Sequence, residues 1–312
     1  MYPSTPNKGQ PYRIEVLSLL LSLTVGVWAL QFFNDEPGAA GPGICSDSSK
    51  RERRLALHDT HWRTDHRAFI AHAGGGINGV TYTNSLEAIT SSIARGYRLI
   101  ELDLLVSSDG YIVAAHDWKT FRQRTGREVL AAEDQALSLS DFRARKIDDL
   151  FTPVDEQMIR GLLLQHPDLI IVTDKITDFP TLARALPLPE RLVVEVFSPK
   201  DFVAAKLAGI THPMLSVGDL AGSFDFIRSN AVGHLAVSTR ELLRCPGAAA
   251  RLIESGVVVF SFTSNDADFM AKYLRSHVSA FYTDFWNVST GRCDHGSCAP
   301  PTAGKTSTTG AQ

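Results

Sequence analysis

The stretch Leu99–Trp118 reads LIELDLLVSSDGYIVAAHDW, and it constrains the fold more than any other part of the chain. Its first half is an apolar run that contains Glu101 and Asp103, two residues apart. Because side chains alternate along a strand, both carboxylates are predicted to lie on one face of a strand. Two acids on a shared, partly buried face are costly unless a cation lies beside them.

The second half of this stretch predicts a strand that folds back on the first. Residues 107–110 (SSDG) are typical of a tight turn, and residues 111–115 (YIVAA) form a second short apolar run. The connection is too short for the crossover that parallel strands need, so the pair is predicted to be a hairpin that brings His116 over the two carboxylates. Oxygen ligands beside an imidazole favour metal-assisted chemistry. The alternative is a half-buried strand whose acids pair with Lys or Arg.

Size and charge limit the classes of function. The chain has 312 residues, of which 44% are hydrophobic, and a single α/β barrel of about 250 residues would use most of it. The formal net charge is −3 and the pI is near 6.4, so no general attraction to nucleic acid is expected.

The N-terminal part is predicted to target the membrane. Residues 1–13 carry Lys8 and Arg13 and are expected to be cytoplasmic. Residues 14–33 form an apolar run in which Glu15 is the single charged residue. A run of this length predicts either a transmembrane signal anchor or a signal peptide. The basic residues that precede the run place the following domain outside the cytoplasm, so the chain is expected to be membrane-anchored or secreted.

The rest of the chain divides into three predicted segments: a linker (34–65), a catalytic domain (66–290) and a disordered tail (291–312) that is rich in Gly, Pro, Ser and Thr. Two of the four cysteines, Cys293 and Cys298, could close a small loop in that tail, and the spacing of the four does not resemble a zinc site.

Strands and helices alternate through the domain, which predicts a parallel sheet. Eight strands are expected, excluding the return arm of the hairpin: 68–72, 99–103, 169–174, 192–197, 214–217, 235–238, 257–262 and 280–283. Helices are expected at 85–95 with Asn84 as N-cap, and at 155–165, 199–207 and 239–255. This pattern predicts an α/β fold, a (β/α)₈ TIM barrel. Residues 117–153 are expected to form a small insertion after the second strand, over the barrel mouth, helical between Ser140 and Leu150.

Polar residues gather where the predicted strands end. His72 ends the first strand, Glu101 and Asp103 the second, and Asp174 the third, and Asp284 follows the eighth. In such barrels the C-terminal ends of the strands form the active site, so these side chains are expected to surround one cavity.

Ordered short blocks resemble the glycerophosphodiester phosphodiesterase family, whose usual pattern is H-R-G, E-N-T, E-x-D, D-G and H-D. The matching blocks here are 71–74 (AHAG), 83–85 (TNS), 101–103 (ELD), 109–110 (DG) and 116–117 (HD). Further matches are 124–126 (RTG), 152–153 (TP) with Glu156, and 282–284 (YTD). The resemblance covers about residues 66–290 and implies a barrel that hydrolyses phosphodiesters with a divalent metal. Ala73 and Thr83 stand where the family usually has Arg and an acid.

The acids are the expected metal ligands. Glu101, Asp103 and Asp174 could offer three oxygen ligands to Ca²⁺ or Mg²⁺. The family takes its third ligand from an E-x-K stretch, whereas this chain has Thr173-Asp174-Lys175. On a regular strand Lys175 would face away from Asp174, unless the strand end re-aims it. If the strand end turns Lys175 back toward Asp174, its ammonium group is a candidate phosphate contact.

Two histidines and several neighbours complete the expected site. His72 and His116 are predicted to act as general base and general acid, in an order that the sequence leaves open. Gly74, in the loop 74–79, is a candidate phosphate contact through backbone N–H groups. Asn84 is a candidate ligand or orienting group, and Trp118 a candidate contact for a lipid or head group, although aromatic residues more often serve packing.

The predicted function is therefore a metal-dependent phosphodiester hydrolase that acts on a small phosphodiester or a lipid head group. Two alternatives remain at this stage: a phospholipase of the same superfamily that acts on intact lipid, and a catalytically inactive barrel that binds a ligand. The membrane is an expected partner through the N-terminal segment, and nucleic acid is not.

Overall fold

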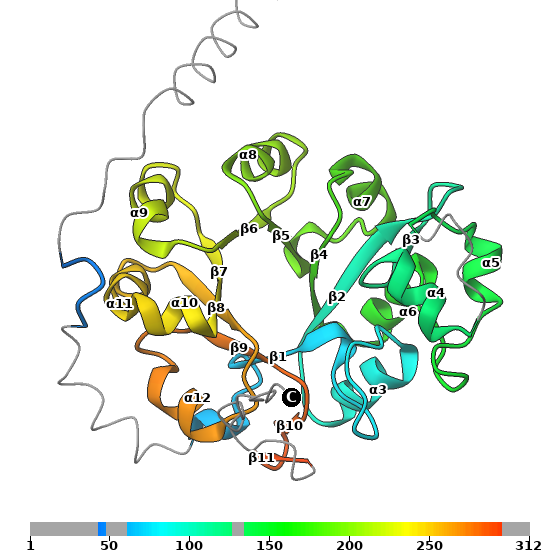
Figure 1. Ribbon diagram of the computed structural model, residues 1–312, viewed down its shortest axis with the longest axis horizontal. Helices are drawn as coiled ribbons and strands as arrows, with labels where there is room; N and C mark the ends of the chain where they lie inside the picture. The colour runs from blue at the N-terminus through cyan, green and yellow to red at the C-terminus, as the bar shows by residue number, and fades with distance from the viewer. Residues whose placement is uncertain (1–42, 48–60, 127–133, 295–312) are drawn as a thin grey trace, which may run out of the picture. The chain divides into compact units, whose positions relative to one another are not determined.

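The computed structural model describes residues 43–47, 61–126 and 134–294. Eight parallel strands form a closed barrel, and helices surround the ring of strands (Figure 1). The barrel strands are β1 (Phe69–Ala71), β2 (Leu99–Val106), β4 (Ile170–Asp174), β5 (Leu192–Val196), β6 (His212–Val217), β7 (His234–Ser238), β8 (Val258–Phe262) and β9 (Ala280–Thr283). Strand β1 pairs with both β9 and β2, which closes the ring. All eight predicted strands are confirmed, and so is the barrel.

The predicted hairpin is also confirmed. Strand β3 (Ile112–Ala114) pairs antiparallel with the extended end of β2, with Leu104 opposite Ala114 and Val106 opposite Ile112. The turn between them is closed by the Ser107 hydroxyl, which donates to Asp109 and accepts from the backbone N–H of Tyr111. The hairpin therefore carries His116 back toward the barrel.

Alternation along the strands separates two apolar layers. Inward-facing residues such as Ile70, Leu99 and Val172 fill the barrel, and outward-facing residues such as Ile100 and Leu102 pack beneath the helices. On each strand, every second residue points into the barrel. On several strands the last inward-pointing residues, at the C-terminal end, are polar. The apolar interior of the barrel is therefore followed by a polar cavity at that end.

The helices lie between the strands. They are α3 (Leu86–Ala94), α6 (Glu156–Gln165), α7 (Phe179–Ala185), α8 (Pro199–Leu207), α9 (Leu220–Ser229), α10 (Thr239–Arg244), α11 (Pro246–Glu254) and α12 (Ala267–Tyr273), with the short helix η3 (Pro189–Arg191) before β5. All of them except α11 and η3 begin with a side-chain cap. Asp155 caps α6, as expected. The single helix predicted over 239–255 is wrong, because Pro246 lacks the N–H that would continue it and begins α11 instead.

The predicted cap of α3 is also wrong. Ser85 is the N-cap, and its hydroxyl accepts from the backbone N–H of Ala88 at 3.2 Å. Asn84 lies one residue earlier with φ +48°, which turns its side chain away from the helix. This leaves the Asn84 amide free for another task.

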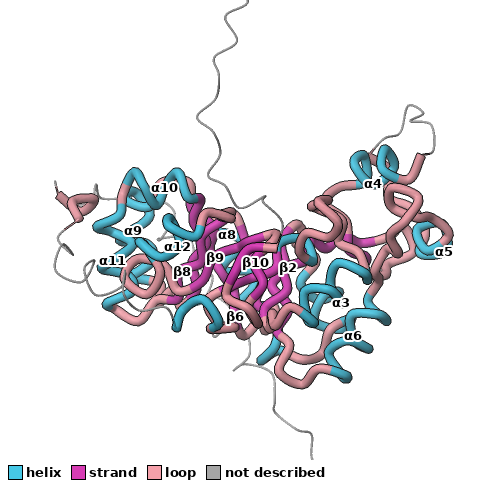
Figure 2. The backbone as a smooth tube through the Cα atoms, turned by 90° about the horizontal axis from the view of Figure 1, so that it is seen from below, coloured by secondary structure: helices cyan, strands magenta, loops and turns pink. Residues whose placement is uncertain are grey.

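The insertion after the hairpin has its own small core. Helices α4 (Trp118–Arg124) and α5 (Leu139–Arg143) lie to one side of the strands (Figure 2). Trp118 packs there edge-on to Phe121 and Phe142. The helix predicted between 140 and 150 is too long: α5 ends at Arg143, and Ile147 and Phe151 form a bridge across a tight loop.

Short elements flank the barrel on both sides. The short helix η1 (His61–Thr64) buries Trp62, which stacks on Trp286 at 5.6 Å between ring centroids. Strands β10 (Trp286–Asn287) and β11 (Arg292–Cys293) pair antiparallel beyond the barrel. In residues 43–47, 61–126 and 134–294 no helix is long and apolar enough to cross a membrane. The predicted span 14–33, the segment 1–13 and most of the tail lie outside the described residues.

A disulfide ties part of the predicted linker to the barrel. Cys45 is bonded to Cys245, which precedes α11, across 200 residues of sequence. The backbone N–H of Gly247 donates to the Cys45 carbonyl at 3.2 Å, and Ile44 packs against the outer apolar layer. Cys293 is also disulfide-bonded, and its expected partner, Cys298, lies outside the described residues.

We expect the double substitution Cys45→Ser/Cys245→Ser to lower the free energy of unfolding by about 2–4 kcal/mol, because it removes a constraint on a long loop of the unfolded chain. Urea unfolding followed by circular dichroism measures this change. Ser46→Ala, in the same segment, is the matched control. A double variant as stable as the parent would contradict the expectation.

Candidate active site

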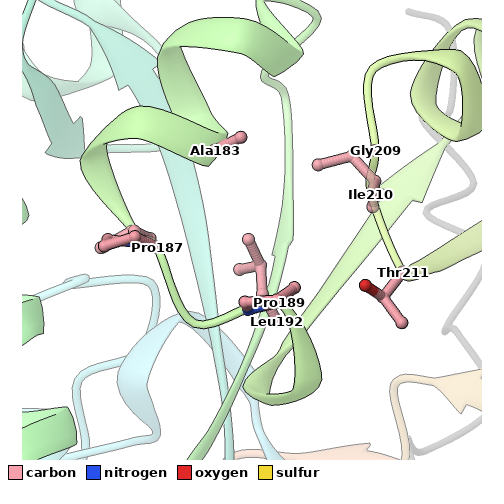
Figure 3. Close-up of a pocket in the computed structure, with 8 residues that line it drawn as sticks. Ala183, Pro187, Pro189, Leu192, Gly209, Ile210 and Thr211 are labelled. Carbon is pink, nitrogen blue, oxygen red and sulfur yellow. The ribbon is translucent and has the colours of Figure 1, made fainter.

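A cavity of about 200 Å³ lies at the C-terminal ends of the barrel strands. Its walls are His72, Tyr82, Glu101, Asp103, His116, Asp174, Lys175, Glu195, Phe197, Phe262, Thr263 and Tyr282. A second hollow of about 230 Å³ lies where β5 and β6 begin, and Figure 3 shows residues such as Pro187, Leu192 and Ile210 around it. No ionisable side chain lines that second hollow, so the first cavity is the candidate for chemistry.

Three carboxylates meet in the first cavity as the sequence predicts. Glu101, Asp103 and Asp174 each present an oxygen within 4.8 Å of the others. The backbone N–H of Ala73 donates to Glu101 at 2.6 Å. The Asn84 amide donates to Asp103 at 2.8 Å and accepts from its backbone N–H at 3.1 Å. Asn84 therefore holds Asp103 in place from behind.

The electrostatics of this triad suit a divalent cation. Burial raises the pKa of Glu101 well above its ordinary value, and the Asp103 carboxylate raises it further. Burial also raises the pKa of Asp174 to about 8, again with Asp103 contributing. The Oδ1 atom of Asp174 is buried and has no hydrogen-bond partner. Three carboxylates with only one lysine beside them offer hard oxygen ligands that fit Ca²⁺ or Mg²⁺.

Lys175 enters the cavity although it directly follows Asp174. Its backbone has φ +63°, so the regular alternation of β4 ends there and the side chain turns inward. Its Nζ lies 3.3 Å from Asp174 Oδ2. The strand end thus re-aims the lysine, and the cavity gains a cation that a phosphate could contact.

His72 is fixed by a network of residues that directly follow β8 and β9. Its Nδ1 lies 3.2 Å from Asp284 Oδ1 and 3.4 Å from the Thr263 hydroxyl. Asn265 positions Asp284: its amide donates to Asp284 Oδ2 at 2.7 Å and accepts from the Asp284 backbone N–H at 2.8 Å. Asn265 was not predicted, because it follows β8 in a loop without a recognised pattern.

His116 has the same arrangement on the hairpin side. Its Nδ1 lies 2.6 Å from Asp117 Oδ2, and Asp117 also caps α4 by accepting from the backbone N–H of Thr120. A carboxylate at Nδ1 favours the tautomer that carries its proton there. In that tautomer each histidine keeps Nε2 available as an acceptor.

Tyr82 lies between the two histidines and was not predicted. Its ring is edge-on to His72 at 4.4 Å and to His116 at 6.3 Å between centroids. Arg124 holds the loop by donating to the carbonyls of Thr81 and Tyr82, and it pairs with Asp148 of the insertion. Burial and nearby carboxylates raise the pKa of the Tyr82 phenol.

Glu195 is a fourth cavity carboxylate that the sequence reading missed. It lies on β5 and is 7% exposed. Its Oε2 accepts from the Tyr282 hydroxyl at 3.2 Å, and burial raises its pKa. The signal was present: Val193 faces the barrel, so Glu195 two residues later must face it too.

Two of the predicted substrate contacts lie away from the cavity walls. Gly74 packs against α3, where a Cβ would come within 3.2 Å of Ile89 Cγ1, and its carbonyl accepts from the Ser92 hydroxyl. Trp118 is buried in the core of the insertion. Asn84 is hydrogen-bonded to Asp103. Two other aromatic residues, Phe197 and Phe262, do line the cavity.

The raised pKa of Asp174 predicts that the metal-free protein loses stability as pH rises. Between the ordinary pKa of 3.8 and about 8, the unfolded chain has lost this proton while the folded chain retains it, so each rise in pH favours unfolding. The melting temperature should be lower at pH 8 than at pH 6, and Asp174→Asn should reduce the difference. A melting temperature that rises over this range would contradict the assignment.

Comparisons with known proteins agree with this geometry. Residues 66–196 match the sequence model of the Glycerophosphoryl diester phosphodiesterase family. None of the curated proteins matches the chain significantly.

Solved structures share the fold. A glycerophosphodiester phosphodiesterase from Thermotoga maritima has 19% identity, covers 71% of this chain and 95% of its own, and gives a TM-score of 0.57. One from Agrobacterium tumefaciens has 14% identity, with 72% and 99% covered and a TM-score of 0.59. An Oleispira antarctica phosphodiesterase in complex with the product sn-glycerol-3-phosphate has 16% identity, with 72% and 95% covered and a TM-score of 0.58. Residues 66–196 are therefore similar in sequence to the Glycerophosphoryl diester phosphodiesterase family, and the chain shares its fold with solved glycerophosphodiester phosphodiesterases.

Proposed function

We propose that the chain hydrolyses glycerophosphodiesters with a divalent metal and a histidine pair. The observation that carries the proposal is that three carboxylates, Lys175 and two carboxylate-held histidines line one cavity. The product complex of the Oleispira antarctica phosphodiesterase, a protein of the same fold, supports this substrate class.

Glu101, Asp103 and Asp174 would hold the metal, with Asn84 and the Ala73 N–H fixing two of the three. A bound divalent cation would neutralise phosphate charge and lower the cost of placing three acids together. Lys175 lies beside Asp174 and would contact a phosphate oxygen.

The histidines would move the protons. One Nε2 takes a proton from the attacking water or a neighbouring substrate hydroxyl, and a new P–O bond forms. The other imidazole, in its protonated form, donates a proton to the leaving oxygen as the old P–O bond breaks. Asp284 and Asp117 would stabilise whichever imidazole is positively charged. Attack by water gives the monoester directly, and attack by a hydroxyl gives a cyclic phosphate.

The test is turnover of glycerophosphodiesters and a chromogenic phosphodiester by the full chain, with chelator, Ca²⁺, Mg²⁺ or Mn²⁺. Turnover should vanish with chelator and return with metal. Asp103→Asn should weaken the metal titration. No turnover with any metal by the folded protein would refute the proposal.

If the histidine pair supplies general acid–base catalysis, His72→Ala and His116→Ala should each lower kcat by roughly 10²-fold or more. His66→Ala is the matched control, because His66 is exposed and lies outside the cavity. Steady-state kinetics at saturating metal measures the effect. A loss of only a few-fold would exclude the role for that histidine.

We also propose that the domain works outside the cytoplasm, either membrane-anchored or secreted. The Cys45–Cys245 disulfide supports this location, because such bonds persist in oxidising compartments. The apolar run 14–33 after basic residues supports it from the sequence.

Protease added to intact cells that express the chain should digest the barrel domain if the domain is anchored at the outside, and a secreted domain should appear in the medium. Lysed cells are the control for protease susceptibility. A domain that stays with the cells and is cut only after lysis would contradict the proposed location.

A further inference from the structure

Arg95 is a buried arginine that the proposed chemistry does not use. It is the C-cap of α3, is 9% exposed and lies outside the cavity wall. Its hydrogen-bond acceptors are neutral: Nη1 donates to the Asp284 carbonyl at 3.3 Å, and Nη2 donates to the Gly76 carbonyl at 3.0 Å and to the Ser92 hydroxyl at 2.9 Å. Among the residues that the structure describes, no carboxylate forms an ion pair with it. A guanidinium stays charged in proteins, so its burial without a counter-charge is costly.

The guanidinium joins the two loops that carry His72 and Asp284. The first loop follows β1 and runs from His72 to Gly76, and the second follows β9 and begins at Asp284. The backbone N–H of Gly76 donates to the Asp284 carbonyl at 2.7 Å, and Arg95 binds the carbonyls of both residues. Asp284 Oδ1 in turn lies 3.2 Å from His72 Nδ1. Arg95 therefore fixes the backbone of both loops next to this pair.

The glycines of the first loop allow it to lie this close to α3. At Gly75, where φ is +94°, an added Cβ would lie 2.1 Å from Ser92 Oγ and 2.9 Å from Arg95 Nη2. At Gly76 it would lie 2.3 Å from the ring of Phe285, in the second loop. No side chain fits at either position without displacing these neighbours. The run of glycines therefore serves the contact between the two loops and the arginine.

We propose that Arg95 is a positioning residue, which clamps the two loops together and so holds the His72 imidazole against Asp284. This inference rests on the proposed function, because its effect on the rate requires the histidine chemistry. Helix α3 then supports the site from both ends. Asn84, just before its N-cap, holds Asp103, and Arg95, at its C-cap, holds the loop that carries His72.

The test is a double-mutant cycle in the full chain, with kcat measured on the chromogenic phosphodiester at saturating metal. Arg95→Met keeps an unbranched apolar side chain and removes the hydrogen bonds, so it should lower kcat by about tenfold or more while KM and the metal titration change little. Arg95→Lys keeps the charge without the planar fork and should have an intermediate kcat. In the His72→Ala background, Arg95→Met should lower kcat by about twofold or less, because the imidazole that it misplaces is already gone.

Arg191→Met is the matched control. The Arg191 guanidinium also binds backbone carbonyls, but it lies just before β5, at the opposite end of the barrel from the cavity. This variant should melt at a lower temperature and keep its kcat where it is folded. Ser92→Ala removes one acceptor of Arg95 and runs the same cycle with a smaller expected loss, should Arg95→Met not fold. An equal loss of kcat with and without His72, or an effect on KM alone, overturns the inference.

Nuclear magnetic resonance gives a second measurement that does not depend on turnover. In protein with isotope-labelled histidine nitrogens, at a pH where the ring is neutral, the His72 signals are assigned through His72→Ala. They should show the Nδ1–H tautomer in the parent and in Arg191→Met, and a mixture of tautomers in Arg95→Met. Unchanged His72 signals in folded Arg95→Met overturn the inference and leave the hydrolase intact. Absence of turnover on every diester, with His72 signals that depend on Arg95, would refute the hydrolase and retain the clamp.

Discussion

The mutual repulsion of carboxylates buried at one end of the barrel is the constraint on which the site depends. Glu101 and Asp103 share a strand face, and the neighbouring strand adds Asp174 at the same level, because Asp103 and Asp174 are register partners. A backbone N–H and the Asn84 amide offset part of this cost, and the raised pKa values of Glu101 and Asp174 show that much of it remains. A divalent cation bound beside the cluster would offset the rest of this cost.

The barrel could be predicted from the sequence because its signal is local and repeated. Apolar runs of strand length alternate with helical segments through the domain. The active-site acids followed from the same rule, since the C-terminal end of each strand faces the cavity. The two wrong helix predictions lie where a single residue sets the backbone conformation. Pro246 divides one expected helix, and the positive φ of Asn84 moves the N-cap of α3 to Ser85.

Parts of the site could not be predicted because they depend on packing between distant segments. Gly74 looked like a phosphate contact, but its place against α3 is visible only once the barrel is closed. Tyr82 reaches the histidines because Arg124 and Asp148, which lie on the insertion, hold its loop. Lys175 reaches the cavity because the backbone leaves the strand conformation directly after Asp174. Glu195 differs from these, because strand alternation alone places it in the barrel.

The two histidines are held by different parts of the fold. The carboxylate partner of His72 is Asp284, the residue after the last barrel strand, and the partner of His116 is Asp117, the N-cap of α4. The distance between the histidines therefore depends on how the insertion packs against the barrel. Arg124 links these two parts, because its guanidinium binds the Tyr82 loop and Asp148 together. Departures from the family pattern at Ala73 and Thr83 remove polar groups near this junction, while the groups that would move protons and hold the metal remain.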